Sequence, residues 1–200
     1  MNATHLDKQM IAFFDEKLKG NTVAQYALEN NNPRLFLIEV ARSLVGVREV
    51  GGNNRGPIVK LLQLTIGDAN GEAWCMATVQ TCVAYTCLKF GIKNHLFPSE
   101  HCLTVKKYSP VEMLVVSIPR PGAIAIYQHG NTSNGHTGIV LEYNIETGFM
   151  YLIEGNVEHG IDANGAEIRQ GGGVYLTKRH IKGDGDMKVV GFLKPFLLQS

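Results

Sequence analysis

The chain has no long apolar run and almost no excess of charge of either sign. No stretch of its 200 residues approaches the roughly 20 consecutive apolar residues of a membrane-spanning helix. Its formal net charge is +1, so no global field attracts nucleic acid or an anionic membrane surface. We therefore expect no nucleic-acid partner and no membrane insertion.

Residues 1–20 lack the features of a secretory signal peptide. They have no basic start, no long apolar centre and no small-residue cleavage site. This composition predicts synthesis in the cytoplasm without a signal peptide.

Cysteine is scarce, and no two cysteines form a Cys-x-x-Cys pair, which argues against a zinc knuckle or a thioredoxin-like motif. The four residues are Cys75, Cys82, Cys87 and Cys102. The first three fall on one predicted helix, at separations that do not favour mutual disulfides. We expect all four to be reduced, as is usual in a cytosol.

The remaining composition suits a globular domain. An apolar share of 44% and a charged share of 18% are ordinary, and 200 residues can bury a core without disulfides or metals. The pattern predicts a helical N-terminal extension over residues 1–32 and a main domain over residues 33–200. Nothing in the sequence indicates the oligomeric state.

Apolar residues recur at helical spacing throughout the first half of the chain. Helices are predicted over residues 6–18, 22–29, 35–45, 57–66 and 74–90. Pro33 and Pro57 suit helix starts, and Gly91 suits a helix end. In the last helix, a single apolar stripe from Met76 to Phe90 is expected to pack inward.

The second half of the chain reads as strands joined by turns rich in Gly, Asn and Asp. Strands are predicted over residues 123–128, 137–143, 149–153, 173–177 and 189–192. Because the helices come first and the strands follow, we predict an α+β fold with an antiparallel sheet.

Cys75 lies where a polar loop becomes the helix predicted over residues 74–90. A helix N-terminus lowers the pKa of a thiol through its unpaired N–H groups and its dipole, and the thiolate is the reactive form. A nearby histidine can hold the proton and return it to a leaving amine, while N–H groups stabilise the oxyanion. Cys75 is therefore the candidate nucleophile, and the other three cysteines are interpreted as buried structural thiols.

His136 is the preferred candidate for the general base. It begins a predicted strand, and Glu154 and Asn156 end the next one. In an antiparallel hairpin the end of one strand lies beside the start of its partner, so Glu154 is expected close to the imidazole. Asn156 is two residues further on and shares a side of the strand with Glu154, so it could face the imidazole or the substrate.

Together, Trp74-Cys75 with its helix, the Gly-His-Thr-Gly segment at residues 135–138 and the Glu-Gly-Asn segment at residues 154–156 resemble the CHAP domain. This is a family of cysteine- and histidine-dependent amidohydrolases and peptidases of the papain-like clan. The resemblance covers about residues 35–195 and implies a papain-like α+β fold, with helices packed against an antiparallel sheet and residues 33–200 as the catalytic domain.

The resemblance also implies roles for individual residues. Cys75 would be the nucleophile, His136 the general base, Glu154 the group that orients it and Asn156 a supporting polar residue. Known members of the family cut peptidoglycan, either as N-acetylmuramoyl-L-alanine amidases or as endopeptidases on the peptide cross-links.

Several residues near this constellation keep a second interpretation. His129 and His159 are rival histidines that better suit exposed loops. Trp74 suits either core packing or a wall of the cleft that binds substrate. Glu154 could be a surface carboxylate at a strand end, and Asn156 could serve only a turn.

A metal is the remaining alternative for the loop before the cysteine. Asp68, Asn70 and Glu72 alternate oxygen-bearing side chains, as part of a calcium loop does. Some CHAP domains bind calcium in this loop, but the full EF-hand pattern is absent. A solvated turn is favoured, and we expect no cofactor.

The main hypothesis is a peptidoglycan hydrolase that attacks an amide carbonyl with Cys75 and passes through an acyl-enzyme. Its partner would be a stem peptide or cross-bridge, reached at the bacterial cell wall after release from a phage-infected cell or after injection by a secretion machine. The alternatives are a non-catalytic wall- or protein-binding module on the same scaffold, and a cysteine amidase acting on a small amide or a protein thioester.

Overall fold

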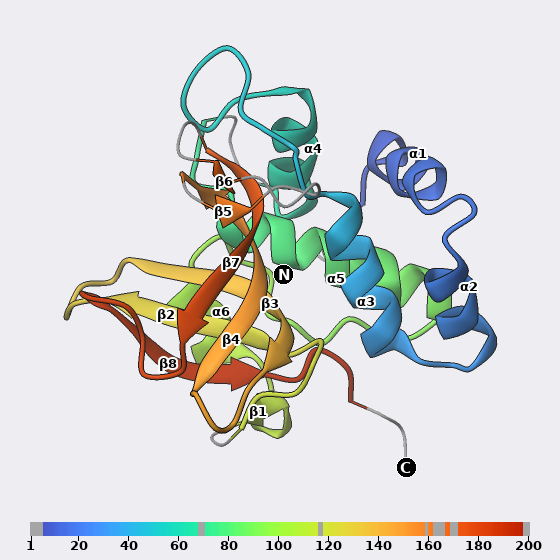
Figure 1. The fold of residues 1–200 in the computed structure, drawn as a ribbon. Helices are drawn as coiled ribbons and strands as arrows, with labels where there is room; N and C mark the ends of the chain where they lie inside the picture. The colour runs from blue at the N-terminus through green and yellow to red at the C-terminus, as the bar shows by residue number, and fades with distance from the viewer. Residues whose placement is uncertain are drawn as a thin grey trace.

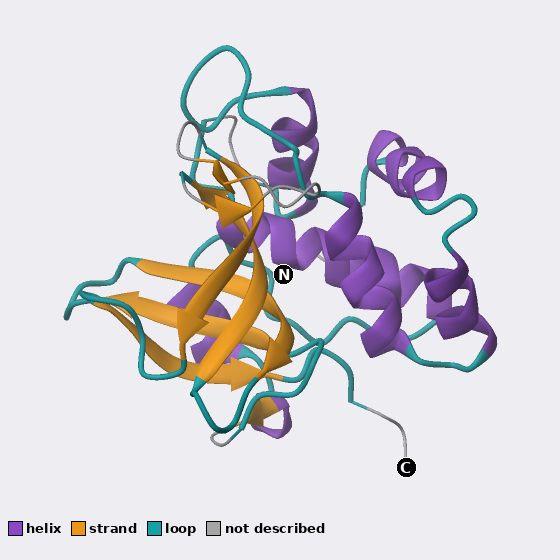
Figure 2. Cartoon of the chain, viewed as in Figure 1, coloured by secondary structure: helices purple, strands orange, loops and turns teal. Residues whose placement is uncertain are grey.

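The molecule consists of a helical layer and a sheet (Figures 1 and 2). The computed structural model describes residues 6–67, 71–115, 118–158, 160–161, 167–168 and 172–197. The helices in these ranges are α1 (Lys8–Lys17), α2 (Thr22–Glu29), α3 (Pro33–Ser43), α4 (Pro57–Thr65), α5 (Cys75–Phe90), α6 (Cys102–Tyr108) and the 3-10 helix η1 (Val111–Met113). None of these helices has the length and apolarity needed to cross a membrane.

The strands form one antiparallel sheet. They are β1 (Leu114–Val115), β2 (Ile124–His129), β3 (Gly135–Tyr143), β4 (Phe149–Val157), β5 (Gly160–Ile161), β6 (Glu167–Ile168), β7 (Gly173–His180) and β8 (Met187–Leu193). Within the described ranges their order is β1-β8-β2-β3-β4-β7-β5-β6. The helices α3 and α5 pack against this sheet, which confirms the predicted α+β fold.

The helix limits follow from local chemistry. Asn21 and Asn32 accept hydrogen bonds from the first turns of α2 and α3, and proline occupies an early position of α3 and α4. Gly91 ends α5 in the left-handed conformation, with φ of 62°. Helix α6 was not predicted because it spans only seven residues, too few for a sustained helical period.

Helix α5 lies at the centre of the molecule. It packs against α3 and α4 and against β3 and β4, and twelve of its 16 residues are buried. The prediction of a single inward stripe was therefore wrong. Buried threonines are tolerated because each hydroxyl donates to the carbonyl four residues earlier, as from Thr78 to Trp74 and from Thr81 to Ala77.

The N-terminal helices share their core with the rest of the chain. Met10 and Phe14 of α1 and Ala24 and Ala27 of α2 belong to the same apolar cluster as the buried residues of α5. The Tyr85 hydroxyl of α5 also donates to the Asp15 carboxylate at 2.6 Å. The boundary proposed at residue 32 stays a prediction.

Candidate active site

Cys75 is the first residue of α5 and is buried, with 6% of its surface exposed. The first N–H groups of a helix have no acceptor within the helix, and the Met76 N–H bonds to the Cys75 sulfur. Helix α5 runs for 16 residues, long enough for its dipole to favour a negative charge at this end. The local structure therefore favours the thiolate.

The segment before Cys75 is held by side chains from two other parts of the chain. The Trp74 Nε1–H donates to Glu49 Oε1 at 3.0 Å, and the indole is fully buried. The buried Gln63 amide donates to the main-chain oxygens of Asn54 and Glu72, at 3.2 and 2.6 Å. Of the two interpretations of Trp74, this position favours core packing over substrate binding.

His136 and Glu154 meet at the β3–β4 pair, as expected for an antiparallel hairpin. Ile139 pairs with Ile153, which places Glu154 diagonally across from His136. His136 Nε2 lies 3.4 Å from Glu154 Oε2, and both side chains are buried. The contact is an ion pair without a well-aligned hydrogen bond, because Nε2 has no hydrogen-bond partner among the described residues.

Gly138 makes this approach possible. A Cβ atom on Gly138 would lie 2.6 Å from Cγ of Glu154 and 3.0 Å from the Ile153 carbonyl oxygen. Only a residue without a side chain therefore lets the Glu154 carboxylate cross β3 toward the imidazole.

Arg179 of β7 completes the surroundings of Glu154, although no feature of the sequence had marked it as a site residue. Its Nε lies 3.1 Å and its Nη2 2.7 Å from Glu154 Oε2, a fork-like pairing with the carboxylate. Nη1 also lies 3.7 Å from Asp184. No motif pointed to Arg179, which is separated from Glu154 by 25 residues and reaches it only through the β4–β7 pairing.

The ionisation of these groups follows from their contacts. A hydrogen bond from Cys102 and then the interaction with His136 hold the pKa of Cys75 well below its usual value, against the opposing effect of burial. Burial lowers the pKa of His136, but the charge of Glu154 and the bond to Cys75 outweigh it and raise that pKa to about 10. Burial likewise opposes ionisation of Glu154, whose pKa His136 and Arg179 lower to about 2.

The arrangement is therefore a row of contacting groups: a thiolate, an imidazolium, a carboxylate and a guanidinium. Since Nε2 of His136 faces Glu154, Nδ1 is the ring nitrogen left for the Cys75 thiol. Such a group of residues can attack a carbonyl carbon and transfer a proton to a leaving group.

Cys102 was interpreted as a structural thiol, and the structure places it in the site. Its Sγ lies 3.8 Å from Sγ of Cys75, and both residues are buried free thiols. The other two cysteines, Cys82 and Cys87, lie further along α5, where burial raises the pKa of each thiol.

Asn156 lies in a break of the strand pairing. Its φ is 58°, in the left-handed region, and the β4–β7 register shifts between Glu154 and Val157. Gly155 lies directly against Thr78 of α5, with no room for a Cβ atom. Asn156 lines the same cavity as His136, and its supporting role remains a prediction.

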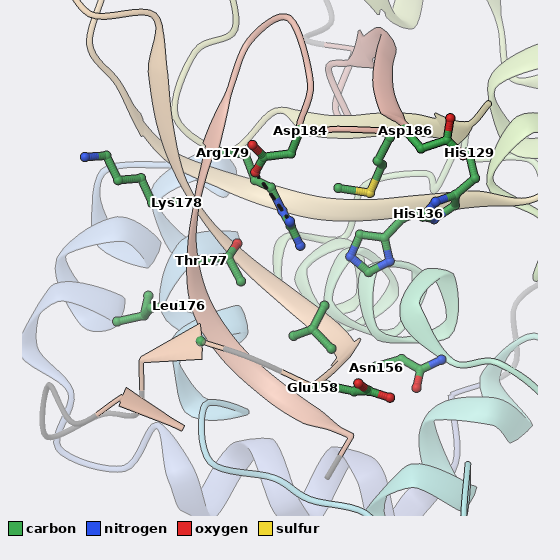
Figure 3. Close-up of a pocket in the computed structure, with 13 residues that line it drawn as sticks. His129, His136, Asn156, Glu158, Leu176, Thr177, Lys178, Arg179, Asp184 and Asp186 are labelled. Atoms are coloured by element: carbon green, nitrogen blue, oxygen red, sulfur yellow. Dashed lines mark ion pairs between the residues drawn. The ribbon is translucent and has the colours of Figure 1, made fainter. Parts of the chain in front are cut away.

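A cavity of about 910 Å³ opens beside His136. Figure 3 shows Arg179 and His136 directed toward its centre and Lys178 directed away from it. The lining includes His129 at the end of β2 and the buried Thr177, whose Oγ1 has no hydrogen-bond partner among the described residues. The cavity thus gives a polar molecule access to the imidazole.

Two of the alternatives raised by the sequence lie wholly or partly outside the described residues. These are His159 as the base, and calcium at Asp68 and Asn70 together with Glu72, of which only Glu72 is described. Within the described ranges, no three His, Cys, Asp or Glu side chains converge as a metal site would require. The calcium alternative stays a prediction.

Comparison with known families gives a match to the segment of chain that carries the candidate site residues. Residues 67–156 match the family model of the CHAP domain, and this range includes Cys75, His136, Glu154 and Asn156. Comparisons with curated proteins and with solved structures gave no match. CHAP domains are generally cysteine-dependent amidohydrolases and typically act on peptidoglycan. The chain therefore contains a CHAP domain, matched over residues 67–156.

Proposed function

We propose that this chain hydrolyses an amide bond of peptidoglycan, with Cys75 as nucleophile, His136 as general base and acid, and Glu154 as the group that orients and charges His136. The observation that carries the proposal is the meeting of Cys75, at the start of α5, with the buried His136–Glu154 pair. The match to the CHAP family supports the reaction class and the wall polymer as substrate.

The reaction begins with the Cys75 thiolate attacking the amide carbonyl carbon. Unpaired N–H groups at the start of α5 stabilise the negative charge that develops on the carbonyl oxygen. The His136 imidazolium gives its proton to the leaving amine, and the C–N bond breaks to leave a thioester on Cys75. His136, now neutral, takes a proton from water, which attacks the thioester and releases the acid and the thiolate.

Glu154 and Arg179 act on His136 without touching the substrate. The charge of Glu154 keeps the imidazole protonated, and the paired guanidinium keeps the carboxylate ionised although it is fully buried. Arg179 is thus proposed as a positioning residue. Asn156, beside His136 in the cavity, is proposed as a polar contact for the imidazole or the substrate.

The substrate proposed is a stem peptide or a peptide cross-bridge. Cleavage of the bond to the lactyl group would make the protein an amidase, and cleavage within the peptide would make it an endopeptidase. In either case it would act at the bacterial cell wall, after release from a phage-infected cell or after injection.

The test is to incubate purified peptidoglycan with the wild type and with Cys75→Ala and to identify soluble fragments by mass spectrometry. We expect fragments with the wild type and a loss of more than about a thousandfold in rate with Cys75→Ala. New amino termini with an intact sugar–peptide link indicate an endopeptidase, and free lactyl-linked glycan indicates an amidase.

Cys82→Ala is the matched control, because Cys82 is also a buried cysteine on the same helix, away from the reacting sulfur. Absence of fragments from every wall type would contradict peptidoglycan as the substrate and leave a binding module or a small-amide hydrolase. Fragments that persist with Cys75→Ala would contradict the thiol mechanism.

A further inference from the structure

We propose that Cys102 is a second functional thiol of this site, whose S–H donates a hydrogen bond to the Cys75 thiolate and so positions and stabilises the nucleophile. The inference rests on the proposed function only in taking Cys75 as the nucleophile. It assigns a role to a residue that contacts the reacting sulfur directly and that lies 27 positions away in the chain.

The contact between the two sulfurs is built into the fold. Cys102 begins α6, is 3% exposed, and has its Sγ 3.8 Å from Sγ of Cys75. Gly135, next to the candidate base, makes room for it. A Cβ atom on Gly135 would lie 3.0 Å from Cβ of Cys102 and 2.8 Å from the Tyr127 carbonyl oxygen, so a larger residue would push α6 away from β3.

The surroundings determine which of the two thiols keeps its proton. Cys75 receives the Met76 N–H and faces His136 on β3, beyond which Glu154 and Arg179 lie. The hydrogen bond to Cys75, followed by burial and by the negative charge of Cys75, raises the pKa of Cys102. The proton therefore stays on Cys102.

A thiol is a weak hydrogen-bond donor to a neutral acceptor, but a bond to an ionised acceptor is shorter and stronger. The Cys75 sulfur thus accepts from three donors, which are the S–H of Cys102, the Met76 N–H and His136. The bond from Cys102 extends to lower pH the range over which Cys75 is a thiolate, as neighbouring donors do at other reactive cysteines.

The first experiment measures the rate of alkylation of Cys75 by iodoacetamide as a function of pH, with the labelled residue located by mass spectrometry. The full-length wild type is compared with Cys102→Ala and Cys102→Ser. For Cys102→Ala we expect the midpoint to move to higher pH and the rate below that midpoint to fall by about tenfold, the equivalent of one hydrogen bond to a charged group. Cys102→Ser keeps a donor and should retain most of the wild-type rate.

Cys82→Ala is the control for general damage to the core. It should lower stability without moving the alkylation midpoint, because Cys82 lies on α5 away from the reacting sulfur. An unchanged midpoint in Cys102→Ala would overturn the proposal, as would an equal shift in Cys82→Ala.

The second experiment uses only the wild type, so a variant that fails to fold cannot affect its result. Native wild type is treated with diamide, which takes two hydrogens from two thiols, is reduced to the hydrazine, and leaves a disulfide. The two sulfurs need to move roughly 2 Å closer to form that bond. We expect a Cys75–Cys102 link in the peptide map and recovery of alkylation after reduction; the absence of this link would contradict the contact.

Both readouts are independent of the wall substrate. A shifted alkylation profile without wall fragments would support the role of Cys102 and contradict the proposed function. Wall cleavage with an unchanged alkylation profile would support the proposed function and contradict the role of Cys102.

Discussion

Glu154 is the residue on which the electrostatics of the site depend. It has no exposed surface, and a buried carboxylate is stable only when cations and hydrogen bonds replace the lost water. Arg179 supplies one cation and His136 the other. Because the same carboxylate serves both, the charge on His136 depends on Glu154.

This dependence predicts the pH profile of Glu154→Gln. The imidazolium is the proton donor to the leaving amine, so activity is lost as pH rises through the pKa of His136, about 10 in the wild type. Without the Glu154 charge this pKa falls, and the alkaline limit of kcat/KM should move to lower pH. The measurement is wall-fragment release over a pH series.

Glu142→Gln is the matched control for that series, because Glu142 is an exposed carboxylate on the same strand as His136. Its alkaline limit should equal that of the wild type. An alkaline limit in Glu154→Gln that coincides with the wild type would mean that the carboxylate does not set the charge of His136.

At the scale of elements, the site depends on how closely the β3–β4 pair approaches α5. Gly155 of β4 lies against Thr78 in the first turns of α5, and Cys75 and Glu154 are carried on these same two elements. The position of the helix relative to the strand therefore sets the position of the thiol relative to the His136–Glu154 pair.

Gly155→Ala is expected to separate the two elements. The added Cβ atom overlaps the Thr78 side chain and cannot be accommodated without movement. Overpacking of this kind costs about 1–3 kcal/mol in the free energy of unfolding, which urea denaturation would measure. Activity should fall by more than stability explains, because the thiol and the imidazole are moved apart.

Gly20→Ala separates this steric effect from the effect of replacing a glycine elsewhere in the chain. Gly20 lies between α1 and α2, where a Cβ atom meets nothing within 4 Å and only the φ of 76° opposes the substitution. Equal losses of activity in the two variants would show that the approach of β4 to α5 does not control the site.

At the scale of the whole molecule, one apolar core joins the N-terminal helices to the site. Phe14 of α1 is fully buried, and its ring centroid lies 4.7 Å from that of Tyr85 on α5. The core cluster that contains Phe14 also contains Cys75. Unfolding of α1 should therefore weaken the helix that carries the nucleophile.

Phe14→Ala tests this coupling. Removing a buried phenylalanine side chain costs about 3–5 kcal/mol, so we expect a large decrease in the free energy of unfolding and a single transition by all probes. Tyr26→Ala on α2 is the control, because Tyr26 is 57% exposed and its loss should change stability little. A transition in which α1 melts separately, with the activity of the remainder intact, would contradict a shared core.

The sequence by itself determined the elements and the pairs of residues that local geometry brings together. Helical spacing and capping residues placed five helices, and turn chemistry placed five strands, to within a few residues. The closeness of Glu154 to His136 was also predictable, because it requires only the register of adjacent strands.

The tertiary structure decided every contact that depends on packing between distant elements. Arg179 reaches Glu154 across 25 residues, and Cys102 reaches Cys75 across 27. Burial of most of α5 likewise depends on neighbours from both halves of the chain, since it packs against α3, α4, β3 and β4. Periodicity and strand register act over a few residues, whereas these contacts follow from how a helix, two strands and a short second helix fill one volume.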